Sequence, residues 1–140
     1  MKRVSAEAGK GKRMNQEKTK IVCLCGSLRF KKHFGVIELN QVLEGNIVLT
    51  PCCMYVDAER TDSFMEHKEQ FDKMHFKKIE LADEIIVVDC AETYPNDAYP
   101  KGYIGESTRN EIEHANKMGK PVLFVSQSID IKDYLNSRKF

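Results

Sequence analysis

The chain has 140 residues, 41% of them hydrophobic, and a formal net charge of +1. This length and composition fit one domain with one core, and no apolar run approaches the roughly 18 residues that indicate a membrane span. The chain also begins without the apolar stretch of a secretory signal, and its five cysteines lie in or next to apolar runs, so we expect reduced thiols in a cytoplasmic protein.

The charge is divided unevenly along the chain. Residues 1–20 hold seven lysines and arginines against two glutamates, a net of +5, and the remainder has a net of −4. Because residues 1–19 also lack apolar periodicity, we predict a disordered basic tail there, followed by a single α/β domain at 20–140. A nucleic-acid arm is one reading of the tail, but no aromatic residue is interleaved for stacking, which favours a solvated tail. The domain is mildly acidic, so we do not expect nucleic acid as a partner. Because the chain has no apolar span, we also expect no membrane partner.

Two kinds of apolar pattern alternate along the chain. Continuous apolar runs indicate buried parallel strands, and apolar residues three or four positions apart indicate helices. In chain order the expected elements are a strand at 21–25, a helix at 30–43, strands at 47–50 and 85–88 on either side of a helix at 64–82, a helix at 108–118, a strand at 122–125 and a short helix within 129–140. This order predicts a doubly wound parallel sheet, a flavodoxin-like or Rossmann-like three-layer sandwich.

One edge of the predicted sheet gathers residues that can bind or react. The carboxyl ends of parallel strands open on the same edge, where such folds bind ligands. Gly26 and Ser27 follow the first strand, Asp89 follows the third, and the loop 91–107 leads back to the same edge. The loop exceeds the usual connection length, and its three tyrosines can either stack on a base or pack the loop.

The segment Gly26-Ser27-Leu28-Arg29 suits an anion. The first turn of a helix presents free N–H groups and a positive dipole end, to which Ser27 adds a hydroxyl and Arg29 a bidentate fork. The segment is neither a Walker A motif nor Gly-x-Gly-x-x-Gly, so it supports neither a P-loop ATPase nor an ordinary NAD site. The alternative is structural, with Gly26 permitting a tight turn and Ser27 capping the helix.

Glu111 is the candidate nucleophile. Thr108 precedes it by three residues, the spacing of a capping box, so one reading is that Glu111 only caps the helix. The other is that a carboxylate beside an anion site, with no metal motif nearby, attacks an anomeric carbon and forms a covalent glycosyl-enzyme. A second group must then assist departure of the base, and Asp83, Asp89 and His75 are candidates by position.

The cysteines give no clear metal pattern. Cys25, Cys52, Cys53 and Cys90 all end strands on the ligand edge, where a thiolate site is conceivable. Their spacing matches no zinc motif, and buried free cysteine is common, so we expect no metal cofactor.

Three stretches, in the right order, resemble a known family. They are Cys23-Leu24-Cys25-Gly26-Ser27-Leu28-Arg29, Ala82-Asp83-Glu84-Ile85-Ile86-Val87-Val88, and Glu111-x-x-x-Ala115-x-x-x-Gly119-Lys120-Pro121-Val122. Together they are similar to the deoxynucleoside 5′-monophosphate N-glycosidases, which belong to the nucleoside 2-deoxyribosyltransferase-like superfamily. The likeness extends over residues 20–126.

The resemblance implies a set of roles. Glu111 would attack C1′ of a 2-deoxyribosyl group. Phosphate and sugar contacts would come from Gly26, Ser27, Arg29, Ser107 and Thr108, with Asp89 added from its place on the same edge. The family is usually dimeric, which predicts a homodimer, and its chemistry uses no redox cofactor.

His75 departs from the family pattern, because it stands where the family has a catalytic aspartate, eight residues before Asp83. A histidine exchanges protons near neutral pH, but it is also a common half-buried helix residue. We therefore expect N-glycosidic bond hydrolysis or 2-deoxyribosyl transfer on a nucleotide or deoxynucleoside, with His75 assisting Glu111. The alternative, favoured by the histidine, is a non-catalytic nucleotide-sensing module of the same fold, and a pure interaction domain is the third reading.

Overall fold

A computed structural model describes residues 18–52, 65–89 and 102–127. Its elements are β1 (Ile21–Gly26), η1 (Leu28–Phe30), α1 (Lys31–Leu43), β2 (Ile47–Leu49), α3 (Lys68–Leu81), β3 (Glu84–Val88), α4 (Glu106–Lys117), β4 (Val122–Phe124) and η2 (Val125–Gln127). Nearly all of the predicted basic tail, the predicted helix within 129–140, and Cys53 and Cys90 lie outside the described residues. No helix within the described ranges is long and apolar enough to cross a membrane.

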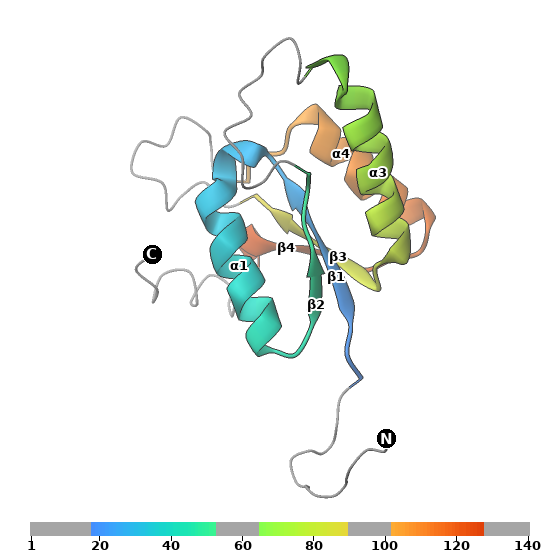
Figure 1. Cartoon of the computed structure of the whole chain (residues 1–140). Coiled ribbons are helices and arrows are strands. Elements are labelled where there is room, and N and C mark those ends of the chain that lie inside the picture. The colour runs from blue at the N-terminus through green and yellow to red at the C-terminus, as the bar shows by residue number, and fades with distance from the viewer. Residues whose placement is uncertain (1–17, 53–64, 90–101, 128–140) are drawn as a thin grey trace, which may run out of the picture.

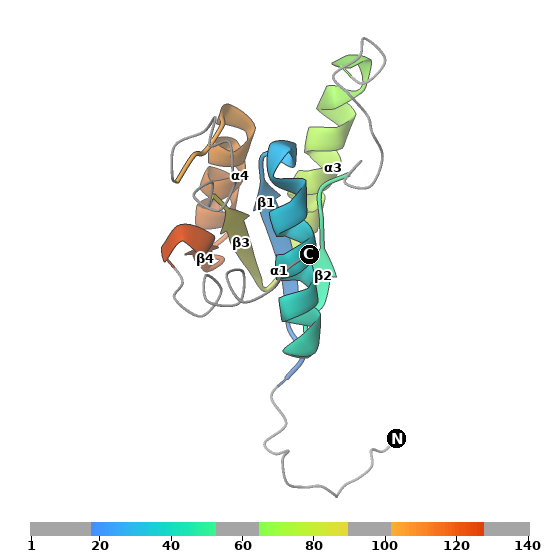
Figure 2. The same cartoon turned by 90° about the vertical axis from the view of Figure 1, so that its left-hand side faces the viewer.

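The four strands form one parallel sheet in the order β2-β1-β3-β4 (Figure 1). Helix α1 covers one face, and α3 and α4 cover the other, as the two perpendicular views show (Figures 1 and 2). The predicted three-layer α/β sandwich is thereby confirmed. The strand order is that of the flavodoxin-like arrangement, whose ligand crevice lies where chain connections leave in opposite directions.

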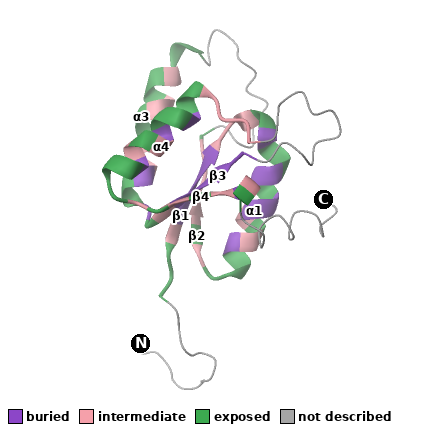
Figure 3. Ribbon diagram, turned by 180° about the vertical axis from the view of Figure 1, so that it is seen from behind, coloured by how far each residue is buried: buried purple, intermediate pink, exposed green. Residues whose placement is uncertain are grey.

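The central strand β1 contributes side chains to the core on both faces of the sheet. Side chains alternate between the faces of a strand, so Val22 and Leu24 pack towards α1, while Cys23 and Cys25 pack towards α3 and α4. All four residues are 0% exposed, and the buried positions of the sheet are visible in Figure 3. Burial on both faces is why this strand reads as a continuous apolar run.

Two apolar residues of the helices lie at the surface, because other positions of α1 and α3 face the sheet. Met74 is 45% exposed, because α3 turns His75 and Ile79 inward instead. Val42 is 52% exposed, because the inward stripe of α1 runs through Gln41, whose Oε1 accepts a 2.9 Å hydrogen bond from the Asn46 side chain. The apolar spacing that predicts each helix therefore does not place all of its apolar residues in the core.

The shorter strands are also less buried than expected. Ile47 in β2 is 53% exposed and Leu123 in β4 is 37% exposed. Both strands lie at the edges of the described sheet, where only one neighbour shields each strand. The expected fully buried strand at 122–125 is therefore a half-exposed edge strand, and Val125 belongs to η2 instead.

The start of α4 corrects the predicted capping box. The helix begins at Glu106 with Gly105 as its N-cap residue, and no side chain caps it. Thr108 is therefore the third helical residue, and Glu111 lies in the second turn, too far along to cap the first N–H groups. The reading of Glu111 as a capping residue is wrong, and its side chain is directed into the protein instead.

The end of α4 matches its prediction. Gly119 has φ +72°, and its N–H donates to the Asn116 carbonyl at 3.0 Å. The N–H of Lys120 donates to the Ala115 carbonyl at 2.9 Å. These two bonds form a Schellman motif, which satisfies the last carbonyls of the helix.

Two aspartates form hydrogen bonds at opposite ends of β3. Asp83, at the amino end, accepts a 2.8 Å hydrogen bond from the backbone N–H of Ile21 through Oδ2. Asp89, just past the carboxyl end, accepts from the N–H and the hydroxyl of Ser126 at 2.8 and 2.7 Å. Its carbonyl also accepts from the N–H of Gly102 at 2.9 Å, so one hydrogen bond joins two residues that are thirteen positions apart in the sequence.

Candidate active site

A pocket of about 270 Å³ opens at the carboxyl edge of the sheet. Three segments supply most of its lining: the turn after β1, one face of α3, and the start of α4. The helices that follow β1 and β3 lie on opposite faces of the sheet, so the pocket lies at the crevice where folds of this order bind ligands. Gly26, Ser27, Arg29, Ser107 and Thr108, all predicted from the sequence, contribute to the lining.

Two buried titratable side chains face each other in this pocket. The Nε2 atom of His75 lies 3.9 Å from Oε1 of Glu111, and their side chains are only 5% and 12% exposed. Both residues line the pocket, His75 from α3 and Glu111 from α4. The structure thus brings together the two residues that the sequence singled out for catalysis.

Helical spacing puts these side chains inside. His75 lies one turn before the fully buried Ile79, and Glu111 lies one turn before the fully buried Ala115. Residues four apart share a helix face, so the same apolar anchors that hold α3 and α4 on the sheet direct the imidazole and the carboxylate inward. Helices α3 and α4 pack directly against each other.

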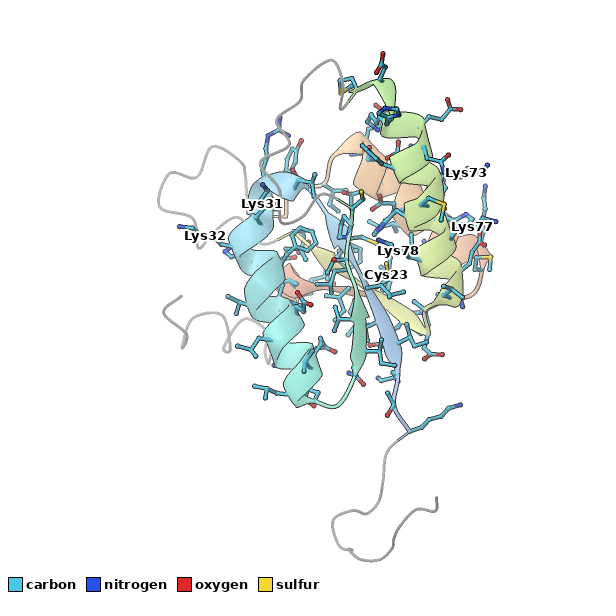
Figure 4. The ribbon with its side chains drawn as sticks, in the orientation of Figure 1. Cys23, Lys31, Lys32, Lys73, Lys77 and Lys78 are labelled. Atoms are coloured by element: carbon cyan, nitrogen blue, oxygen red, sulfur yellow. The ribbon has the colours of Figure 1, made fainter. Side chains whose placement is uncertain are left out.

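Two thiols complete the surroundings of the imidazole. The Sγ atoms of Cys25 and Cys23 lie 3.5 and 3.8 Å from Nε2 of His75. Figure 4 shows Cys23 on β1 with Lys78 of α3 nearby, and this lysine helps to stabilise the thiolate form of Cys23. The other ring nitrogen, Nδ1, is buried and has no hydrogen-bond partner among the described residues.

Burial dominates the electrostatics of Glu111. It raises the pKa of Glu111 from 4.5 to about 7, and the neighbouring His75 opposes this shift while Cys23 adds to it. A buried carboxylate resists ionisation because the charged form loses its hydration. Glu111 is therefore poised between the protonated and ionised forms near neutral pH.

The two thiols and the imidazole shift one another's pKa values. A hydrogen bond from Cys25 lowers the pKa of Cys23 to about 6, despite burial, and His75 contributes in the same direction. That hydrogen bond, together with burial, raises the pKa of Cys25. Burial alone lowers the pKa of His75, but the hydrogen bond and charge of Cys23, with the charge of Glu111, raise it overall.

The mouth of the pocket carries groups suited to an anion. Arg29 lines it from the turn after β1, and Lys68 lines it from the first turn of α3. The Lys68 ammonium donates to Oδ2 of Asp72 at 2.7 Å and to the hydroxyl of Ser107 at 3.2 Å. The Ser27 hydroxyl oxygen accepts a hydrogen bond from the N–H of Arg29 at 3.2 Å, so Ser27 caps η1 as the structural alternative expected.

Asp89 lies outside the pocket, unlike the other predicted site residues. It is 2% exposed, does not line the pocket, and uses both carboxylate oxygens to bind Ser126. Asp83 lies at the amino end of β3, the opposite end from the pocket. Of the three candidates for assisting base departure, only His75 reaches Glu111.

Three charged residues of the pocket were not predicted from the sequence: Lys68, Asp72 and Glu106. A signal for the two on α3 was present, because Lys68, Asp72 and His75 are four and three residues apart and so share one helix face. Recognising it required knowing that His75 points inward. Of the three loop tyrosines, Tyr103 lines the pocket, and Tyr94 and Tyr99 lie outside the described residues.

The arrangement can perform nucleophilic and proton-transfer chemistry. An ionised Glu111 can attack an electrophilic carbon, and a protonated His75 can donate to a leaving group. A scan against protein-family models gives no match for this chain, and a search of curated proteins gives none either. The geometry of the pocket and the family resemblance are therefore the observations that bear on function.

Proposed function

We propose that this protein cleaves or transfers at the N-glycosidic bond of a nucleotide or deoxynucleoside, with Glu111 as the nucleophile. The observation that carries the proposal is the Glu111–His75 pair, 3.9 Å apart and nearly buried, in a pocket that also contains Arg29 and Lys68. A reacting sugar carbon would meet the carboxylate inside, while a 5′-phosphate would lie against the two cations and the N–H groups at the start of α4.

The proposed reaction has two displacements. A carboxylate oxygen of Glu111 bonds to C1′ as the C1′–N bond breaks, the departing base takes the bonding electron pair, and His75 donates the proton that the base needs. Water, or a second base, then attacks C1′ and releases Glu111, with His75 accepting the proton from that nucleophile. This sequence is the retaining mechanism of glycosidases, written with an imidazole in place of one carboxyl group.

The separation of the two groups is nearer to that of retaining than of inverting glycosidases. Inverting glycosidases hold their two groups about 6.5–9.5 Å apart to accommodate a water, and retaining enzymes about 5–5.5 Å. The 3.9 Å between His75 Nε2 and Glu111 Oε1 lies below both ranges, so a sugar enters only if the two side chains move apart. Direct attack by Glu111 requires the smaller movement of the two mechanisms.

The pKa of Glu111 gives the proposal a pH dependence. Only the ionised carboxylate attacks, and burial raises the pKa of Glu111 to about 7. Turnover is therefore expected to increase as the pH rises from 6 to 8, until His75 loses the proton that it must donate. A rate that is flat from pH 5 to 8 would argue against an attacking Glu111.

A nucleotide-sensing module remains the second candidate, and one observation favours it. His75 replaces the aspartate of the resembled family, and two thiols lie within 3.8 Å of its Nε2 atom. An imidazole held in this way can serve binding without serving proton transfer. The pocket would then bind a nucleotide without cleaving it, and the bound nucleotide would stabilise the folded protein.

The test is to incubate the protein with a panel of nucleoside and deoxynucleoside 5′-monophosphates and to measure the release of free base by chromatography. Base release by the wild type and not by Glu111→Gln would support the glycosidase and identify its substrate. No release from any member, with a ligand-dependent rise in melting temperature, would support the sensing module. Neither release nor a thermal shift would leave the interaction domain as the remaining reading.

A further inference from the structure

A cluster of three metal-binding side chains lies beside Glu111. The Sγ atoms of Cys23 and Cys25 and a ring nitrogen of His75 all lie within 4.8 Å of one another. All three residues are buried, with exposures of 0%, 0% and 4%. The sequence alone did not reveal this cluster, because the histidine is fifty residues from the thiols and no zinc motif has that spacing.

The separations of the donor atoms suit a tetrahedral ion. With Zn–S bonds of about 2.3 Å and Zn–N bonds of about 2.0–2.1 Å, tetrahedral angles put sulfur and nitrogen about 3.5 Å apart. The observed Sγ–Nε2 distances are 3.5 Å for Cys25 and 3.8 Å for Cys23. A cation can therefore enter with only small movements of the side chains.

The fold keeps these donors on one side. Cys23 and Cys25 are two residues apart on the central strand β1, so their side chains project from the same face of the sheet. His75 meets them from α3, which packs on that face. A metal on Nε2 leaves the proton of the ring on Nδ1, which is buried and has no hydrogen-bond partner among the described residues.

We propose that Cys23, Cys25 and His75 bind a Zn²⁺ ion, with a carboxylate oxygen of Glu111 as the fourth ligand. Thiolate and imidazole ligands select zinc over magnesium or calcium, which prefer oxygen. Glu111 is within reach, since Oε1 lies 3.9 Å from the histidine nitrogen and its carboxylate contacts the Cys25 thiol. Two thiolates, one imidazole and one carboxylate make a closed four-coordinate site.

The metal and the proposed chemistry exclude each other. A zinc ion held by Glu111 and His75 occupies both the nucleophile and the proton donor, so the loaded protein cannot form the glycosyl-enzyme. The site would therefore make turnover sensitive to zinc. Its ligands are protein atoms only, so binding itself does not depend on the proposed function being correct.

Cobalt spectroscopy on the full chain tests the site directly. Protein stripped with a chelator is titrated with Co²⁺, whose tetrahedral thiolate complexes show an intense visible band and a sulfur-to-metal band in the near ultraviolet. We expect both bands to saturate at one equivalent and to disappear when Zn²⁺ is added. An absence of these bands, with the protein folded by circular dichroism, would overturn the proposal.

Variants identify the ligands. Cys23→Ser and Cys25→Ser should each weaken zinc binding by at least about tenfold in competition with a chromogenic chelator. Cys52→Ser is the matched control, because Cys52 is an exposed cysteine outside the cluster. Equal affinity of the wild type and the Cys23→Ser variant, or an equal loss in Cys52→Ser, would contradict the assignment.

A measurement on the unaltered chain covers the case of a variant that does not fold. The ¹¹³Cd chemical shift of the cadmium-loaded wild type moves downfield with each sulfur ligand, so two thiolates predict a shift between those of one-sulfur and four-sulfur sites. A shift typical of oxygen ligands alone would refute the site. If base release is never seen, these binding results still stand, and if metal fails to bind, base release is unaffected, so the two proposals fail separately.

Discussion

Burial governs the behaviour of Glu111 at the scale of single residues. Its pKa is raised from 4.5 to about 7, so the folded protein binds this proton more tightly than the unfolded chain does. Between these pH values the unfolded state holds fewer protons, so stability decreases as pH rises. The contribution of the protonated Glu111 side chain to the free energy of unfolding is complete below pH 4.5 and is lost by about pH 8.

Replacing Glu111 with glutamine should remove this pH dependence. Glu111→Gln is expected to match the wild type near pH 5 and to exceed its stability at pH 8 by up to about 3 kcal/mol, the equivalent of the pKa shift. Denaturant unfolding at the two pH values measures the difference. Glu113→Gln, an exposed residue on the same helix, is the control, and a variant that is less stable than the wild type at pH 8 would contradict the argument.

Arg29 is the residue that should distinguish phosphorylated ligands from unphosphorylated ones. Losing a charge-assisted hydrogen bond costs about 1.5–3 kcal/mol, so Arg29→Ala should weaken binding of a nucleoside 5′-monophosphate about 10- to 100-fold. Binding of the corresponding nucleoside should change little. Calorimetric titration of both ligands checks this, with Lys32→Ala on the exposed side of α1 as the control (Figure 4). Equal losses for both ligands would remove Arg29 from the phosphate contacts.

The sequence predicted individual site residues unevenly. Glu111 was predicted from its place near the start of a helix at the ligand edge, and His75 from its match to the aspartate of the resembled family. Gly26, Ser27 and Arg29 were predicted because parallel strands open on one edge. Lys68 and Asp72 were missed because their importance depends on which face of α3 points inward. The thiol–imidazole cluster was missed because it joins residues from two distant elements, and no local pattern records such a contact.

At the scale of elements, the turn after β1 depends on the absence of a side chain. Gly26 has φ +149°, and a Cβ added there would lie 2.8 Å from the carbonyl oxygen of Val88 and 3.2 Å from the ring of Phe34. Both neighbours are buried and belong to packed elements. The turn after β1 and the close approach of β1 to β3 therefore require glycine.

A pair of alanine substitutions tests this requirement. Gly26→Ala should destabilise the fold by about 2–3 kcal/mol, because it combines an unfavourable φ with a backbone clash. Gly35→Ala, in the exposed interior of α1 with nothing within 4 Å of its added Cβ, should instead stabilise the fold by about 1 kcal/mol. Thermal unfolding of both variants gives the comparison, and similar melting temperatures for the two would contradict the packing argument.

The ends of α4 show which element boundaries a sequence determines. Its C-terminus was predicted correctly because Gly119 is the residue that a left-handed C′ position favours. Its N-terminus was not, because Thr108 and Glu111 have the spacing of a capping box while the helix in fact begins at Glu106. Burial of Glu111 against His75 competes with capping, and a local motif contains no information about that tertiary contact.

At the scale of the whole molecule, the fold was predictable because few topologies fit alternating apolar strands and amphipathic helices. Short right-handed connections leave a parallel, doubly wound sheet as the natural solution. The surface was less predictable. Leu43, Ile47 and Leu81 are 66%, 53% and 69% exposed, although each belongs to an apolar stretch of the sequence.

These exposed side chains bear on the predicted homodimer. Large apolar side chains at the surface are more common where another chain binds, and the resembled family is usually dimeric. We therefore expect a species of twice the monomer mass in sedimentation equilibrium. Leu81→Lys, at the end of α3, is a first probe of the interface, and a monomer at all concentrations of wild-type protein would contradict the prediction.

The hydrogen bond between Gly102 and Asp89 has a consequence for how such a protein can diversify. It brings the two ends of the 90–101 segment together, and the Asp89–Ser126 bonds hold that junction to η2 at the end of the sheet. The entropic cost of closing a loop grows only slowly with its length. Connections of other lengths can therefore join Asp89 to Gly102 at little cost to the fold, because hydrogen bonds hold both anchors in place.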